Sequence, residues 1–470
     1  MFKERDSEAR ANPAPARRVS YRILLQIATT DAHSDELLNG AEVDALSAQD
    51  RNLTTTLVLG TLRWQLALDA RIRELLARPD AKLSPEAATA LRMGAYQLLY
   101  LDRVPAHAAI HDSVELVKRG KERGTAGMVN AVLRRVQGAG TSRPGGGALR
   151  AQKLPDGSGE QSIAAEAALA HPAWMVERWV RRYGSAAAEE ICRWDQEPAG
   201  TTIRGIALRA DPQMEFADLE TEPGAFLSCA RRVVGGDARA AVRAGQVRIQ
   251  DEASQLVGEL LAGGANEKPL RVLDLCAAPG GKTAILLERL PEAQVTAVDV
   301  SRSRVLAARA GRFAAQGRVK WEVADAAKLE LRPEWDRILC DVPCSGTGTL
   351  ARNPEIRLRL TEADLKRQRA RQVAILRSGL AGLAAGGRLV YSTCSLEPEE
   401  NEDVIAAVLG GAPGFRVVPV AGILDGLAAS GVLTAEGRER LRSATEGEFL
   451  RTIPGVHPCD GFFAAALERG

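Results

Sequence analysis

The chain has 470 residues, which is too long for a single hydrophobic core, so two or three domains are expected. Of these residues 45% are hydrophobic and 26% are charged, which is an ordinary composition for a soluble protein. Its 62 Lys and Arg residues are balanced by 60 Asp and Glu residues, so any nucleic-acid-binding surface must be local. Seven Cys without a CxxC pair, five His and no apolar run of membrane-spanning length lead us to expect a cytoplasmic protein with no metal and no membrane contact.

The first 137 residues show helical patterning. Ser84-Pro85-Glu86 has the form of a helix N-cap followed by Pro at the first helical position. Apolar Leu91, Ala95 and Leu98 then recur at the spacing of one helix face. We therefore predict an all-α bundle over residues 1–137.

Gly and Pro dominate residues 138–163, which predicts a flexible linker and a domain boundary. After it, His171-Pro172-Ala173-Trp174 is expected to start a helix that runs through Trp179 and Tyr183, and short strand-like runs with acidic and Gly turns follow. We predict a small α+β subdomain over residues 164–250 and a catalytic domain over 251–470.

From Leu270 onward, strand-like and helix-like patterns alternate. The predicted strands are 271–275, 294–300, 319–324, 338–341 and 388–392, and the predicted helices are 283–290, 303–316, 362–385 and 400–409. Such alternation predicts an α/β, doubly wound (Rossmann-like) parallel sheet. Ligands of such sheets bind at the carboxyl ends of the strands, near the point where the strand order reverses.

The first of these strands runs into a Gly-rich turn, Asp274-Leu275-Cys276-Ala277-Ala278-Pro279-Gly280-Gly281-Lys282-Thr283. Backbone in such a turn can approach a ligand closely, and the N-terminus of the following helix favours negative charge. A nucleotide triphosphatase is disfavoured, because Cys276 stands where the Walker A motif requires Gly. The GxGxxG spacing of dinucleotide sites is also absent.

Two acids follow the next two strands. Asp299 ends the second strand, where a carboxylate can accept hydrogen bonds from ribose hydroxyls, and Asp325 follows the third, near the expected adenine. Each acid could instead cap a helix. With the Gly-rich turn, they describe an adenosyl site without a pyrophosphate site, which favours S-adenosylmethionine over NAD. The candidate cofactor contacts are Cys276, Ala277, Ala278, Pro279, Gly280, Gly281, Lys282, Asp299, Asp325 and Asp341.

Two cysteines follow the last two predicted parallel strands. Cys344 comes three residues after Asp341, and Cys394 follows the strand 388–392. Because these strands are expected to be neighbours or nearly so, the two thiols and Asp341 should face one cleft, where a thiolate can act as a nucleophile. A small buried Cys is the alternative interpretation of each.

These blocks resemble the signature motifs of the NOL1/NOP2/Sun family of RNA cytosine-C5 methyltransferases. The further blocks that carry the resemblance are Asn353-Pro354-Glu355-Ile356-Arg357, Pro398-Glu399-Glu400-Asn401-Glu402, residues 250–255 and Asp460-Gly461-Phe462-Phe463. Residues 104–108 and 129–134 resemble the NusB-like RNA-binding domain. The chain departs from the family in its long Gly/Pro linker and at Arg357-Leu358-Arg359, where many relatives carry an aromatic residue.

The resemblance implies a methyltransferase that uses S-adenosylmethionine and acts on RNA. The fusion of a NusB-like domain to this catalytic domain is similar to bacterial enzymes that methylate a cytosine of 16S rRNA. The expected substrate is therefore 16S rRNA, either free or in a small-subunit particle. By resemblance, Cys394 attacks C6 of the base, Asp341 binds the base, Cys344 assists product release, and Lys282 steadies Asp341 or the cofactor carboxylate. We expect a monomer.

Basic side chains gather after the Cys344 loop. Beside a cleft that must admit RNA, they are candidates for phosphate contacts, although a solvated helix face is the alternative interpretation. These residues are Arg352, Arg357, Arg359, Lys366, Arg367, Arg369 and Arg371.

Two other functions remain open at this point. In a DNA cytosine-C5 methyltransferase the Pro-Cys of the loop would itself be the nucleophile, but here a second strand-end Cys is present and no target-recognition domain is visible. A non-catalytic RNA-binding or assembly factor, built on the helical domain, is disfavoured by the intact set of strand-end acids and thiols.

Overall fold

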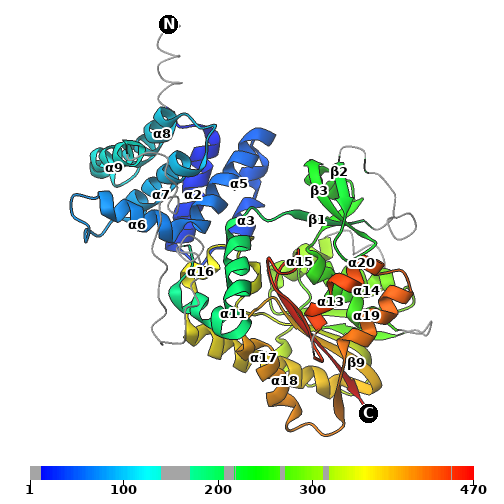
Figure 1. Ribbon diagram of the computed structural model, residues 1–470. Helices are drawn as coiled ribbons and strands as arrows, with labels where there is room; N and C mark the ends of the chain where they lie inside the picture. The colour runs from blue at the N-terminus through cyan, green and yellow to red at the C-terminus, as the bar shows by residue number, and fades with distance from the viewer. Residues whose placement is uncertain are drawn as a thin grey trace. The chain divides into compact units, whose positions relative to one another are not determined.

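A computed structural model describes residues 12–138, 170–205, 216, 219–264, 270–310, 317–445 and 447–470. The chain divides into two compact units (Figure 1). One comprises residues up to Ala199 together with Leu350–Arg359, and the other comprises Gly200–Thr349 and Leu360–Gly470. Except for Gly138, the predicted linker lies outside the described residues. None of the helices described combines the length and the hydropathy that a membrane span requires.

The first unit is helical, as predicted. Its helices are α2 (Pro15–Thr29), α3 (Ser34–Leu38), α4 (Ala41–Asp44), α5 (Ala48–Arg63), α6 (Gln65–Leu75), α7 (Pro85–Tyr100), α8 (Ala106–Lys118), α9 (Ala126–Gly138), α11 (Ala173–Gln196) and α16 (Ile356–Arg359), with a 3-10 turn η1 (Arg123–Thr125). Helix α7 packs on α2, α5, α6, α8 and α9. It starts as predicted, because the Ser84 hydroxyl accepts a hydrogen bond from Ala87 N and Pro85 is the first helical residue.

Helix α11 belongs to this helical unit, although the sequence pattern grouped it with the small α+β subdomain. The Asp195 carbonyl, near the end of α11, accepts a hydrogen bond from Arg357 at 3.2 Å. Arg357 is 1% exposed and belongs to the inserted segment Leu350–Arg359. A buried contact between residues so far apart in the sequence leaves no local pattern, which is why the grouping differs.

The second unit carries a small antiparallel sheet. Its elements are β1 (Thr201–Gly205), β2 (Leu219–Pro223), β3 (Ala230–Gly236), α12 (Ala238–Arg243) and β4 (Val247–Ile249). The strand order is β2-β3-β1-β4. From β1, the buried Arg204 donates hydrogen bonds to Glu259 at 2.7 Å and to Glu288 at 2.9 Å. These ion pairs join the small sheet to the helices that cover the main sheet.

Within the part of the chain that the structure describes, the main sheet has eight strands. The strands, helices and 3-10 turns of this part are α13 (Glu252–Ala262), β5 (Arg271–Asp274), α14 (Gly281–Arg289), β6 (Gln294–Asp299), α15 (Arg302–Ala310), β7 (Val319–Val323), η4 (Ala326–Lys328), β8 (Trp335–Asp341), η5 (Thr347–Thr349), α17 (Glu362–Gly382), β9 (Leu383–Thr393), η6 (Pro398–Glu400), α18 (Glu402–Leu409), β10 (Phe415–Val418), α19 (Val420–Ala429), α20 (Ala435–Arg440), η7 (Ser443–Thr445), β11 (Leu450–Thr452) and β12 (Phe462–Arg469). The order is β10-β12-β9-β8-β5-β6-β7, and β11 also pairs with β12.

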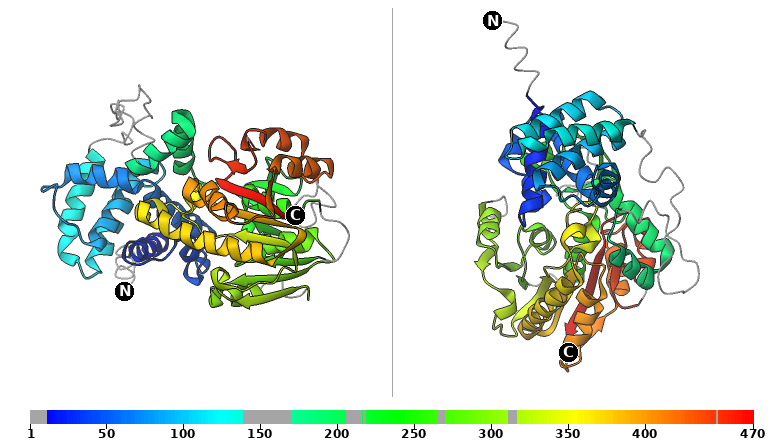
Figure 2. Two further views of the ribbon diagram at one scale, coloured as in Figure 1. Left: turned by 90° about the horizontal axis from the view of Figure 1, so that it is seen from below. Right: turned by 90° about the vertical axis from the view of Figure 1, so that its left-hand side faces the viewer.

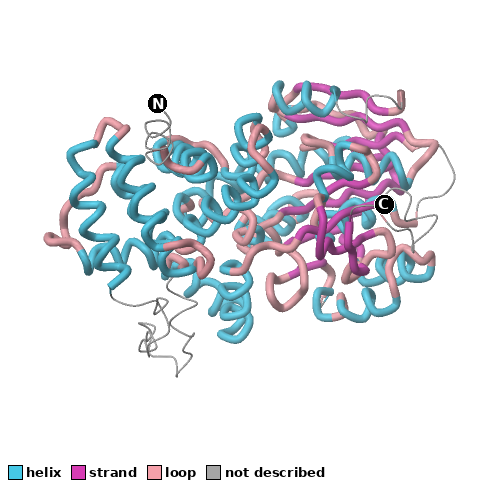
Figure 3. Tube along the Cα trace, turned by 90° about the horizontal axis from the view of Figure 1, so that it is seen from above, coloured by secondary structure: helices cyan, strands magenta, loops and turns pink. Residues whose placement is uncertain are grey.

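Five of these strands, β5 to β9, run parallel as predicted. The sheet is nevertheless mixed, because β12 pairs antiparallel with β9, β10 and β11. The C-terminal strand β12, red in Figure 2, thus lies inside the sheet. The predicted helix 362–385 ends at Gly382, where β9 begins. Figure 3 draws the strands of both sheets in magenta and the helices beside them in cyan.

Both faces of the main sheet are covered by helices. Alternate residues of a strand point to opposite faces, and Val272 packs in a core with α13, α14 and α19. Its neighbour Leu273 packs in a second core with α17 and α18. The chain moves outward from β5 through β6 to β7 and then crosses to β8 on the other side of β5. The strand order therefore reverses between β5 and β8, where a ligand site is expected.

The Arg204 ion pairs yield a test of this architecture. Arg204→Met should lower the free energy of unfolding by about 1–3 kcal/mol, because the buried Glu259 would lose one of its two cationic partners and keep only Arg289, at 2.7 Å. The control Arg232→Met removes an exposed pair with Glu222 in the same small sheet and should change stability by less than about 1 kcal/mol. Thermal unfolding of the two variants would compare them, and equal midpoints would contradict the inferred role of Arg204.

Candidate active site

The Gly-rich turn joins β5 to α14 at the point of strand-order reversal. Gly280 has φ of 106° and occupies the N-cap of α14. Only glycine adopts this conformation at little cost, so Gly280 lets the chain turn sharply and leaves the N-terminus of α14 open toward the turn. The predicted turn therefore forms where the sequence placed it.

Asp274 lies at the end of β5 and is 1% exposed. Burial raises the pKa of its carboxyl to about 7, while a hydrogen bond from Thr283 Oγ1 to Asp274 Oδ2 at 2.7 Å acts in the opposite direction. The charge of Asp341 also raises this pKa and that of Lys282 lowers it. Asp274 thus holds the start of α14 through Thr283, and its pKa depends on the charges of Asp341 and Lys282.

Asp299 and Asp325 stand at the ends of the next two strands. Both Asp299 oxygens accept backbone hydrogen bonds, Oδ2 from Ala278 at 3.1 Å and Oδ1 from Ser301 at 2.8 Å. Asp325 Oδ1 accepts from Ala327 N at 3.1 Å, and this bond lowers the pKa of Asp325. The capping role that the sequence left open is therefore real for Asp325, which caps η4. Each carboxylate oxygen has further lone pairs for a ligand hydroxyl or amine.

Asp341, the last residue of β8, is held from two sides. Lys282 Nζ donates to Asp341 Oδ2 at 2.7 Å, and Ser392 Oγ donates to Asp341 Oδ1 at 2.8 Å. The Lys282 ammonium also lies 5.2 Å from the centre of the Phe462 ring. These bonds fix the carboxylate in one orientation at the strand end.

The two candidate thiols meet. Cys344 Sγ and Cys394 Sγ are 3.4 Å apart, and both side chains are half-buried. The pKa of Cys344 is raised well above its ordinary value, first because of its hydrogen bond with Cys394 and second because of burial. Cys344 therefore holds its proton more tightly than an ordinary thiol.

Glu400 was not among the predicted site residues, yet it organises the loop that carries Cys344. This carboxylate is fully buried and accepts hydrogen bonds from Ser345 N at 2.9 Å, from the Ser345 hydroxyl and from Gln372 Nε2 at 3.0 Å. The backbone carbonyl of Glu400 accepts a hydrogen bond from the Tyr391 hydroxyl. The acidic run 399–400 was the available signal, but a sequence cannot show which of two adjacent acids points inward.

The predicted basic residues fall into two groups. Lys366, Arg367 and Arg369 are exposed on α17, and Arg371 is half-buried and close enough to Asp325 to lower the pKa of that acid. Arg357 is buried, and its guanidinium donates to three carbonyl oxygens. The predicted RNA contact of Arg357 is therefore wrong for this conformation, because neither its charge nor its bonded donors face solvent.

Arg359 and Arg352 differ from the α17 residues in burial. Arg359 is half-buried and donates to the carbonyls of Ile27 and Thr30 in its own helical unit. Arg352 is also half-buried. Among the described residues, no group of His, Cys, Asp and Glu side chains is placed to hold a metal ion.

A mixed α/β sheet with a Gly-rich turn after its first parallel strand and acids after the next two is the arrangement of a Rossmann-like methyltransferase. Comparison with known proteins agrees. The family described as 16S rRNA methyltransferase RsmB/F matches residues 260–468, and the NusB family matches residues 14–138. A crystal structure of PH0851 has the same fold, with a TM-score of 0.72 and 23% identity over 97% of this chain and 99% of that one.

Curated relatives match along almost the whole chain. The probable ribosomal RNA small subunit methyltransferase B of Bacillus subtilis is 32% identical over 96% of this chain and 98% of its own length. The ribosomal RNA small subunit methyltransferase B of Pseudomonas syringae pv. tomato is 33% identical over 91% of each chain. The chain belongs to the ribosomal RNA small subunit methyltransferase B family.

The raised pKa of Asp274 predicts a pH-dependent stability. A pKa of about 7 in the folded chain, against 3.8 as the ordinary value, means that the folded form binds the proton more tightly. The stability that this proton provides is complete below about pH 4 and is lost as the pH rises through about 7. Relative to Asp274→Asn, the original chain should thus lose roughly 4 kcal/mol across this range, measured by urea unfolding at several pH values.

Thr283→Val provides the matched variant for this experiment. It removes the hydrogen bond that favours the ionised carboxylate, so the loss should extend to higher pH than in the original chain. A stability difference between the original chain and Asp274→Asn that does not change with pH would contradict the assignment.

Proposed function

We propose that this chain transfers a methyl group from S-adenosylmethionine to C5 of a cytosine in RNA, through a covalent bond between Cys394 and C6 of the base. We further propose small-subunit ribosomal RNA as the substrate, because that is the RNA named for its curated relatives. The observation that carries the chemistry is the contact of Cys344 with Cys394, on loops that follow adjacent parallel strands, beside the fixed carboxylate of Asp341.

The residues of the turn fit S-adenosylmethionine. The backbone of residues 276–281, bent by Gly280, can lie close to a ligand, and Asp299 is oriented by two backbone bonds for ribose hydroxyls. Asp325, which follows β7, is our candidate for the adenine amino group, and Lys282 is our candidate for the carboxylate of the donor. When bound, this donor supplies a methyl group on a sulfonium, which departs as a neutral thioether.

The chain's own residues then activate the base. The Cys394 thiolate forms a bond to C6, and the electrons of the C5–C6 double bond make C5 nucleophilic enough to take the methyl group. Asp341 would accept a hydrogen bond from the exocyclic amine and pass to N3 the proton that the Cys394 thiol gives up on attack, which neutralises the charge that develops on the ring. On release, N3 returns this proton to Asp341. Its bonds to Lys282 and Ser392 keep it oriented for this task.

Release requires the reverse at C6. When a water molecule takes the C5 proton, the C5–H bonding electrons restore the C5–C6 double bond, the C6–sulfur bond breaks, and its electron pair returns to Cys394. The Cys344 thiol, whose pKa is raised by its hydrogen bond with Cys394 and by burial, would donate a hydrogen bond to the departing thiolate and stabilise it. The two thiols are thus proposed to take different roles, Cys394 as the attacking group and Cys344 as the hydrogen-bond donor on release.

The basic residues exposed on α17 are proposed to bind RNA phosphates. Lys366, Arg367 and Arg369 lie on the solvent side of this helix. The target base must leave its stack to reach a thiol at a strand end. Methyl incorporation from labelled S-adenosylmethionine into naked 16S rRNA, small-subunit particles and DNA of equal sequence tests the proposal. Incorporation into none of them, or DNA as the better acceptor, would overturn it.

Cys394→Ala should lower methyl transfer by at least about 10³-fold, because C5 is not activated without the adduct. RNA binding in a filter assay should persist, because the thiol carries little of the binding surface. Cys229→Ala is the control, since Cys229 is a buried Cys beside the small sheet of the same unit. Turnover by Cys394→Ala close to that of the control would show that another group attacks C6.

Cys344→Ala should instead accumulate a covalent protein–RNA adduct. Attack by Cys394 remains possible, whereas departure of its thiolate loses the hydrogen bond from Cys344. Denaturing gel electrophoresis with labelled RNA would show a slow band that is absent from the double variant Cys344→Ala, Cys394→Ala. Normal turnover without a band would remove Cys344 from the mechanism.

A further inference from the structure

We call the second unit, Gly200–Thr349 with Leu360–Gly470, the catalytic unit, because it carries the candidate active site. The chain leaves this unit directly after the Cys344 loop. Residues Leu350–Arg359 belong to the helical unit, and the chain re-enters the catalytic unit at Leu360. Five residues separate Cys344 from the start of this segment, which we call the inserted segment. Its placement gives the helical unit a covalent connection to the loop that carries one of the two thiols.

The end of the Cys344 loop has little freedom. Gly348 N donates to the Cys394 carbonyl at 2.9 Å, and Gly461 N donates to the Gly348 carbonyl at 2.8 Å. A Cβ atom at Gly348 would lie 2.1 Å from the Gly461 oxygen, so the two backbones are in contact. Thr349 closes the turn with hydrogen bonds from its N and Oγ1 to the Gly346 carbonyl. A shift of Leu350 would therefore pass to Gly348 and to the backbone of Cys394.

Buried polar bonds hold the inserted segment inside the helical unit. Glu355 is fully buried, and its oxygens accept from Ser34 N at 2.9 Å and from Ser34 Oγ at 2.8 Å. Arg357 donates to the carbonyls of Ala170 at 3.2 Å, of Asp195 at 3.2 Å and of Leu350 within the segment at 3.3 Å. These side chains connect the segment to the start of α3 and the end of α11.

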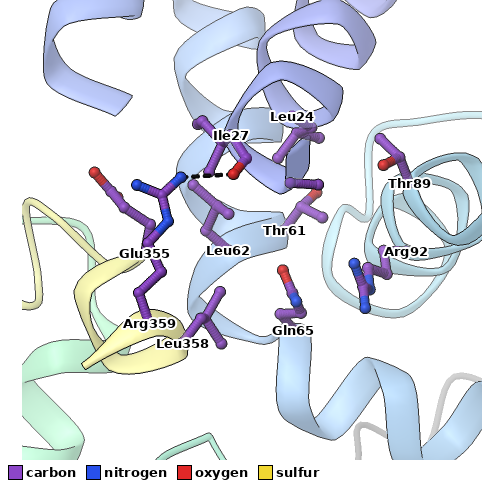
Figure 4. A pocket seen from close by; sticks show the side chains of 11 residues that line it. Leu24, Ile27, Thr61, Leu62, Gln65, Thr89, Arg92, Glu355, Leu358 and Arg359 are labelled. Carbon is purple, nitrogen blue, oxygen red and sulfur yellow. Dashed lines mark hydrogen bonds between the residues drawn. The ribbon is translucent and has the colours of Figure 1, made fainter. Parts of the chain in front are cut away.

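Two further arginines bind backbone at the ends of the inserted segment. Arg63 of α5 donates to the Ala351 carbonyl at 2.7 Å. Arg359 donates to the Ile27 carbonyl, as Figure 4 shows, at the end of α2. In the same view Leu358 and Glu355 face helices of the unit across a pocket of about 280 Å³. The segment is thus fixed at its start, middle and end.

We propose that Glu355 and Arg357 are positioning residues: through them the helical unit sets the position of the loop that carries Cys344 and, through the Gly348–Cys394 bond, of both thiols. This inference rests on the proposed function for its kinetic part only. The helical unit then has two roles. It holds the Cys344 loop in position during the chemical steps, and it binds any RNA that contacts it. Displacement of a reacting group by about 1 Å can lower a rate by about 100-fold, so a modest shift suffices.

Glu355→Gln tests the proposal, with Ser34→Ala as a milder second variant that removes only the hydroxyl donor. Asp112→Asn is the matched control, because Asp112 is a buried acid of the same helical unit that pairs with Arg17 and does not bond the inserted segment. Glu355→Gln should lower kcat by about 10-fold or more while KM for RNA changes less than about twofold.

A second readout does not depend on methyl transfer. Alkylation of Cys344 by iodoacetamide, followed by peptide mass spectrometry, should be slow in the original chain, because this half-buried thiol keeps its proton. It should be at least about fivefold faster in Glu355→Gln and should stay slow in Asp112→Asn. Unchanged alkylation and kcat in Glu355→Gln, or equal effects in Asp112→Asn, would overturn the proposal.

The two readouts separate this inference from the proposed function. If the original chain shows no methyl transfer on any RNA, the alkylation rates alone decide whether the inserted segment positions Cys344. If KM rises in Glu355→Gln while kcat and alkylation stay constant, the segment serves RNA binding and the proposal fails.

Discussion

The pairing of β8 with β9 is the constraint on which the site depends. Parallel backbone hydrogen bonding places Asp341 opposite Ser392, so the serine hydroxyl can bind the carboxylate and the two Cys-bearing loops leave the sheet side by side. A slip of one residue would turn every side chain of one strand to the other face and separate the acid from both loops. The helices on each face fix this register by burying alternate residues of the strands.

Much of this arrangement could be predicted from the sequence, because it follows from order along the chain. A parallel sheet brings the carboxyl ends of its strands to one edge, so acids and thiols placed just after the strands meet whatever the details of packing. Asp274, Asp341 and Cys394 lie where that rule put them. The start of α7 was predictable for a similar reason, since Ser84 and Pro85 act through bonds within a few residues.

The rest depends on contacts that leave no local pattern. β12 is rich in Ala and lacks the β-branched residues typical of strands, and it forms because both its faces are covered inside the sheet. Helix α17 ends at Gly382, three residues before the predicted end at 385, because Leu383 pairs with Trp335 of β8 and so belongs to β9. Arg357 belongs to a basic run that suggested RNA, and only the fold shows that its donors are used by carbonyls at positions far along the chain.

The energetics of the inserted segment support a role in positioning more than in stability. Burial lowers the pKa of Arg357, which shows how unfavourable its environment is for a charge, and apolar residues of similar size would be as stable or more so at such sites. Apolar contacts, however, tolerate sliding, whereas directional bonds from one guanidinium to carbonyls of Ala170, Asp195 and Leu350 allow one placement. A segment that needed only to be covered would gain nothing from such groups. The inserted segment continues the loop that carries Cys344, whose Sγ lies 3.4 Å from Cys394 Sγ, and directional bonds give such a segment a fixed position.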